Sequence, residues 1–102
     1  MAVPQWMSVD VKERIQSGKS VQIIDVREPG EFAGGHIPGA KLIPLGQIMQ
    51  RTKEIDTNKE TVVVCRSGSR SAMACQFLQQ SGFKNVHNLM GGMMSWDGDI
   101  EY

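Results

Sequence analysis

The 102-residue chain has the length of one domain and can bury a single sizeable core. Lysine plus arginine balance aspartate plus glutamate at 11 each, so no overall charge points to nucleic acid or an anionic membrane. An apolar content of 40% argues against disorder, and two cysteines are too few for a disulfide framework. With no secretory signal at the start and no apolar run of about 18 residues, we expect a cytoplasmic protein.

Strands and helices are expected to alternate along the first half of the chain. A short strand at Trp6 and Met7 precedes a helix over residues 9–17, with Ser8 as its N-cap. The nearly all-apolar run at residues 21–26 predicts a strand buried on both faces. The residues at 27–40 are rich in glycine and proline, which predicts an irregular connection with at most one helical turn.

The second half of the chain continues this alternation. A short strand is expected at residues 41–43, followed by a helix that Pro44 introduces. The three valines at 62–64 predict another strand buried on both faces, and residues 85–89 predict a last one. A final helical turn is expected at 93–96. The pattern indicates a three-layer α/β domain with a mainly parallel sheet.

The segment after the three valines carries the strongest chemical signal. Cys65 ends the strand, and Gly68 lies between Arg66 and Arg70 before an amphipathic helix resumes at about Ser71. Open α/β sheets bind ligands at the carboxyl ends of their strands, and free N–H groups of a loop and a helix start form an anion site. The helix dipole and both arginines favour thiolate over thiol. We therefore predict that Cys65 is a nucleophile with a lowered pKa.

Other polar residues are expected to support this loop. Asp25 also lies near a strand end, so a parallel sheet would place it at the same edge as Cys65. A carboxylate aimed at the sulfur would oppose ionisation, so we expect Asp25 to bond backbone N–H groups or an arginine, with Arg27 in the same structural role. His36 is expected to fix its own turn, because a thiolate needs no general base. Cys75 is expected in the core.

Four short motifs are distributed over nearly the whole chain. They lie at residues 24–27 with 31–32, at 35–40, at 65–70, and at 89–92 with Trp96. In their order and spacing they resemble the single-domain rhodaneses, which are thiosulfate sulfurtransferase-like proteins. The resemblance implies one rhodanese-like domain over residues 1–102. It also implies a five-stranded, mainly parallel sheet with helices on both faces.

The resemblance further implies an enzyme in which Cys65 alternates between thiolate and persulfide. Sulfur would come from thiosulfate or a persulfide donor and pass to cyanide, a thiol or a sulfur-accepting protein. Backbone N–H groups of the loop would stabilise the persulfide, and the hydroxyls of Ser67 and Ser69 could add donors. No metal or cofactor is expected. The implied substrate-binding residues are Arg66, Ser67, Gly68, Ser69 and Arg70, and the supporting residues are Asp25, Arg27 and His36.

Two other functions stay open at this point. Phosphatases of the Cdc25 type and similar arsenate reductases use a loop one residue longer, which cradles a tetrahedral oxyanion. The six residues from Cys65 to Arg70 favour the sulfurtransferase instead. The second alternative is a non-catalytic rhodanese-like interaction module. Because such modules commonly lack the cysteine or the basic loop, and this chain has both, the enzyme is the leading interpretation.

Overall fold

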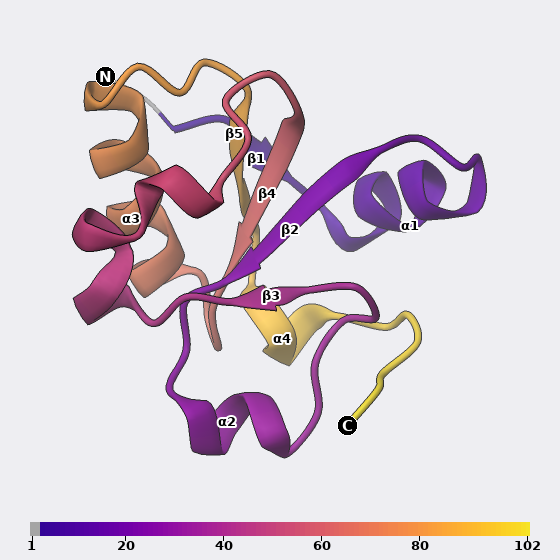
Figure 1. The fold of residues 1–102 in the computed structure, drawn as a ribbon. Helices are drawn as coiled ribbons and strands as arrows, with labels where there is room; N and C mark the ends of the chain where they lie inside the picture. The colour runs from indigo at the N-terminus through magenta and orange to yellow at the C-terminus, as the bar shows by residue number, and fades with distance from the viewer. Residues whose placement is uncertain (1–2) are drawn as a thin grey trace.

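The computed structural model describes residues 3–102 and has a five-stranded sheet at its centre (Figure 1). The strand order is β1-β5-β4-β2-β3, and every neighbouring pair is parallel. The predicted α/β fold with a parallel sheet is therefore confirmed. The strands are β1 (Gln5–Trp6), β2 (Val21–Asp25), β3 (Lys41–Leu42), β4 (Glu60–Val64) and β5 (Val86–Leu89).

Helices cover both faces of this sheet, as Figure 1 shows with α1 on one side and α3 on the other. Two short 3₁₀ helices, η1 and η2, follow β3, and the short α4 follows β5. Within residues 3–102, no helix is both long and apolar enough to cross a bilayer. The helices are α1 (Ser8–Gln16), α2 (Pro29–Ala33), η1 (Leu45–Gln50), η2 (Thr52–Glu54), α3 (Ser69–Gln80) and α4 (Gly92–Ser95).

The central strand β4 divides the core into two layers because its side chains alternate between the faces. Val63 and Cys65 pack with α3, whereas Val62 and Val64 pack with Val11 of α1. All of these side chains are buried. A strand that is apolar on both faces can only lie inside a sheet covered on both sides, which explains the run of three valines.

Details of four expected elements differ in the structure. The first concerns α1, whose N-cap is Met7 rather than Ser8: the Met7 N–H donates to the Asp10 carboxylate at 2.7 Å. Ser8 instead donates its hydroxyl to Asp97 at 2.6 Å, which ties α1 to the C-terminal segment. The first strand accordingly covers Gln5–Trp6 and leaves Met7 to the helix start.

The other two differences concern the segments around Pro44 and Gly68. The helix expected after Pro44 is present and is the 3₁₀ helix η1, in which the Gln47 N–H donates to the Pro44 carbonyl, three residues back, at 2.8 Å. The helix α3 begins at Ser69 rather than at about Ser71. Its N-cap, Gly68, has φ 105°, which lets the chain turn directly into the helix.

Candidate active site around Cys65

The parallel register brings Asp25 and Cys65 to the same edge of the sheet, as predicted. Asp25 of β2 pairs with Val64 of β4, and Cys65 is the next residue. The Val26 N–H donates to the Val64 carbonyl at 2.9 Å and extends the pairing by one step. The cysteine thus lies at the carboxyl end of the central part of the sheet, where ligands of open α/β folds bind.

The sulfur of Cys65 is buried and lies within a ring of donors. The Gly68 N–H donates to Sγ at 3.0 Å and the Ser71 hydroxyl at 3.2 Å. Burial raises the pKa of Cys65, but hydrogen bonds from the Ser71 hydroxyl and from the backbone N–H groups of Ser71, Gly68 and Ser67 outweigh it, so the pKa is lowered overall. The lowered pKa agrees with the sequence prediction, although hydrogen bonds rather than arginine charge are its main cause.

Ser71 contacts the sulfur of Cys65, and the sequence prediction did not include it in the site. Its single hydroxyl proton has two acceptors within reach, Sγ of Cys65 and Oδ1 of the buried Asn88 side chain. A usable signal was present, because Ser71 shares the inward face of α3 with Ala74, Cys75 and Leu78. A serine at that helical spacing among apolar residues needs a polar partner.

Asn88 of β5 was also missed, and it joins three parts of the site. Its amide Nδ2 donates to the Gly68 carbonyl at 3.1 Å and to Gln5 Oε1 at 3.0 Å. The side chain is buried, so these bonds replace the water that it loses. Asn88 therefore fixes the position of Gly68 from the neighbouring strand.

The start of α4 supports the loop from another side. The Met93 N–H donates to the Cys65 carbonyl at 2.9 Å, and the Met94 N–H to the Arg66 carbonyl at 3.0 Å. Gly92 has φ 57°, and a Cβ placed there would lie 2.4 Å from the Cys65 carbonyl oxygen. The second glycine of the Gly91-Gly92 pair is thus required for close contact with the loop.

The two loop arginines differ in their surroundings. Arg70 forms a bidentate ion pair with Glu31 of α2, with both N–O distances at 2.8 Å. Arg66 is exposed, and it forms no ion pair within residues 3–102. The hydroxyls of Ser67 and Ser69 lie 3.5 Å from each other on the exposed side, so the hydroxyl donor to the sulfur is Ser71 and not either of these.

The predicted supporting residues bond to one another or to the segment around α2, and none of these bonds includes the sulfur. Arg27 binds both oxygens of the Asp25 carboxylate at 2.8–3.1 Å and the Gly35 carbonyl at 2.8 Å, so Asp25 is paired with an arginine as expected. His36 stacks on Phe32 with ring centroids 3.6 Å apart, and its Nδ1 lies 2.8 Å from the Phe32 carbonyl. These contacts fix the turn of His36, as predicted.

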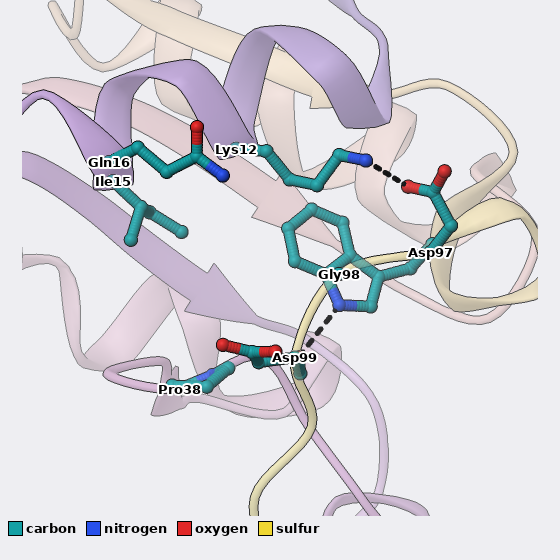
Figure 2. Close-up of a pocket in the computed structure, with 8 residues that line it drawn as sticks. Lys12, Ile15, Gln16, Pro38, Asp97, Gly98 and Asp99 are labelled. Atoms are coloured by element: carbon teal, nitrogen blue, oxygen red, sulfur yellow. Dashed lines mark hydrogen bonds and ion pairs between the residues drawn. The ribbon is translucent and has the colours of Figure 1, made fainter.

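Cys75 and a pocket beside α1 both lie outside this site. Cys75 is buried in the core, and burial raises its pKa to about 12. A pocket of about 330 Å³ lies between α1 and the segment after α4 (Figure 2), and no residue of the cysteine loop lines it. Within residues 3–102 no cluster of histidine, cysteine, aspartate or glutamate could hold a metal ion. The pocket is lined by Lys12, Ile15, Gln16, Pro38, Trp96, Asp97, Gly98 and Asp99.

Comparisons with known proteins cover nearly the whole chain. The profile of the Rhodanese-like domain matches residues 8–99. YtwF of Bacillus subtilis is 41% identical over 99% of this chain and 97% of its own length. "Thiosulfate sulfurtransferase GlpE" of Shewanella oneidensis is 36% identical over 88% of this chain and 89% of its own. The chain spans only 54% of another relative, YrkF of B. subtilis, at 39% identity.

The solved structures show the same fold. A crystal structure of a rhodanese-like domain protein from Staphylococcus aureus has a TM-score of 0.90 and 35% sequence identity to this chain. The similarity covers 97% of both chains. The five-stranded sheet and the helices around it are therefore those of a known domain type.

Proposed function

The chain belongs to the Rhodanese-like domain family and is related to sulfurtransferases, and from this premise we propose that Cys65 carries the transferred sulfur as a persulfide. The observation that carries the proposal is the position of Sγ, which accepts hydrogen bonds from Gly68 and Ser71 within 3.2 Å. Such donors stabilise an anionic sulfur, which the reaction needs both as attacking and as leaving group.

The reaction has two displacement steps. In the first, the Cys65 thiolate attacks the outer sulfur of thiosulfate, a new S–S bond forms, and sulfite leaves with the electron pair of the bond that breaks. In the second, a thiolate or cyanide attacks the outer sulfur of the persulfide, and the Cys65 thiolate leaves. Covalent catalysis of this kind gives ping-pong kinetics.

The loop has separate parts for binding and for stabilising charge. The exposed Arg66 attracts the anionic donor, and the backbone N–H groups of the loop surround the sulfur. Thiosulfate as donor is supported by the name of the relative GlpE, and a small thiol or a sulfur-accepting protein would serve as acceptor. The proposed substrate-binding residues are Arg66, Ser67, Gly68, Ser69 and Arg70.

Asp25, Arg27 and His36 act through α2 rather than on the substrate. The Asp25–Arg27 pair and the bond from Arg27 to Gly35 hold both ends of the segment that contains α2. His36 fastens the end of the same segment to the Phe32 carbonyl. They are positioning residues, because none of these contacts reaches Cys65.

Intact-mass measurement after incubation with thiosulfate tests the proposal. The wild-type protein should gain one sulfur atom, and a thiol acceptor should remove it. The matched variant Cys65→Ser should gain none while keeping its circular dichroism spectrum. A sulfur adduct on Cys65→Ser, or none on the wild type, would overturn the assignment.

A further inference from the structure

The contact between Glu31 and Arg70 links α2 to the cysteine loop. Glu31 Oε1 accepts from Arg70 Nη1 and Oε2 from Arg70 Nη2, each at 2.8 Å. About a third of each side chain is exposed, so the pair lies at the surface beside the loop. Arg70 occupies the first turn of α3, five residues after Cys65.

The carboxylate is held more firmly than the guanidinium. Glu31 Oε1 also accepts the Glu28 N–H at 3.0 Å, which fixes it to the start of its own helix. The segment of α2 is in turn fastened by the bond from Arg27 to the Gly35 carbonyl. Glu31 therefore presents a fixed negative charge to which Arg70 is drawn.

This pairing changes the charge that a substrate meets. Two arginines flank the cysteine loop, but Glu31 neutralises Arg70, whereas Arg66 forms no ion pair within residues 3–102. The net positive charge beside Cys65 is thus close to that of one arginine rather than two. Coulomb attraction scales with the charge of the incoming ion, so a dianion gains more than a monoanion from each added positive charge.

We infer that Glu31 is a specificity-determining residue that limits the attraction of anionic sulfur donors by holding Arg70 in an ion pair. This inference rests on the proposed function and deepens it, because it concerns the charge class of donor that the same site accepts. With Glu31 in place, the binding of dianionic thiosulfate is favoured less strongly over the binding of donors of lower charge. Removing the negative charge of Glu31 should increase this preference for thiosulfate.

The variant Glu31→Gln tests the inference through donor kinetics, because it keeps the shape and removes the charge. The KM for thiosulfate should fall roughly three- to six-fold at low ionic strength, and the difference should shrink as salt is added. The kcat should stay near the wild-type value. Glu31→Asp, which keeps the negative charge, should stay near the wild type in KM.

A second readout does not require sulfur transfer. Iodoacetate and iodoacetamide alkylate thiolates by the same chemistry but differ by one negative charge, so the ratio of their rates at Cys65 reports the local charge. Glu31→Gln should raise this ratio roughly two-fold, and Arg66→Ala should lower it. Peptide mapping separates Cys65 from Cys75, whose raised pKa keeps it unreactive.

Glu54→Gln is the matched control, because Glu54 is also paired with an arginine, Arg51, but belongs to η2 and contacts no loop residue. It should leave both readouts unchanged. An unchanged ratio or a higher KM in Glu31→Gln would overturn the inference and make Glu31 a positioning residue for Arg70. A raised ratio in a protein that forms no persulfide would support the charge effect and overturn the proposed function.

Discussion

At the scale of single residues, the Ser71 hydroxyl is the largest contributor that lowers the pKa of Cys65. The thiol is buried, and burial alone raises its pKa; a hydroxyl at 3.2 Å and three backbone N–H groups reverse that effect. A hydrogen bond to a charged group contributes about 1.5–3 kcal/mol, which is enough to change the balance between thiol and thiolate. We therefore expect the Ser71 hydroxyl to favour the thiolate form of Cys65.

Removing this hydroxyl should raise the pKa of Cys65. In Ser71→Ala the thiolate loses one of its donors, so the pH midpoint of alkylation should lie higher than in the wild type and the rate at pH 7 should fall several-fold. The midpoint is measured by iodoacetamide labelling across a pH series. Ser81→Ala, at the far end of the same helix, serves as the control, and an unshifted midpoint in Ser71→Ala would refute the role of the hydroxyl.

Glu31 also couples stability to pH. Hydrogen bonds from Arg70 and from the Glu28 N–H lower the pKa of Glu31 from 4.5 to about 2. A carboxylate with a depressed pKa contributes stability above the unfolded value of 4.5, and that contribution is lost as pH falls through about 2.

Glu31→Gln should therefore lower the melting temperature at pH 7, and the deficit should vanish as pH approaches 2. Because the ion pair is about one-third exposed, solvent screening keeps its contribution to unfolding free energy at or below about 1 kcal/mol. Thermal unfolding of both proteins at several pH values measures it. A deficit that persists at pH 2 would show that packing, and not charge, is lost.

At the scale of elements, the unit from β4 to α3 could be predicted closely from the sequence. Three valines require a strand covered on both sides, Gly68 supplies the turn, and the apolar face of the following segment predicts a helix. The start of α3 was placed two residues late because the glycine conformation that ends the loop cannot be read from residue type alone. The helix predicted after Pro44 is present, but its 3₁₀ type was not predicted, although Gly46 weakens an α-helix at this position.

The compact loop also predicts which anions the protein will not process. Only residues 66–68 separate Cys65 from α3, and the Gly68 N–H already lies 3.0 Å from the sulfur. Wild-type protein should therefore not hydrolyse p-nitrophenyl phosphate, because its donors surround a single sulfur atom rather than a tetrahedral oxyanion. Release of p-nitrophenol that disappears in Cys65→Ser would favour the phosphatase alternative.

At the scale of the whole molecule, two core layers meet at the central strands. Leu78 of α3 is fully buried in one layer, and Leu89 of β5 is fully buried in the other. The topology could be predicted because alternating strands and helices allow few arrangements. The contacts of Asn88 and Gly92 with the loop could not be predicted from the sequence, because these two residues are more than twenty positions away from Cys65 along the chain.

Shortening a buried core side chain should lower the free energy of unfolding strongly, whereas shortening an exposed side chain should hardly change it. Leu78→Ala should reduce the free energy of unfolding by about 2–5 kcal/mol, because the cavity adds to the lost burial. Met49→Ala, whose side chain is 67% exposed, should change it by less than about 0.5 kcal/mol. Urea denaturation measures both, and a loss below about 1 kcal/mol for Leu78→Ala would contradict this description of the core.

The support that Gly92 and α4 give to the loop has a consequence for biosynthesis. Cys65 and its nearest donors are synthesised first, and Asn88 and the N–H groups of Met93 and Met94 follow some twenty to thirty residues later. Until α4 emerges, the nascent chain carries Cys65 without the neighbours that order its loop. Released chains that end before Gly91 should thus react with maleimide at Cys65 at a different rate from the chain that includes α4, because their loop lacks the hydrogen bonds from Met93 and Met94.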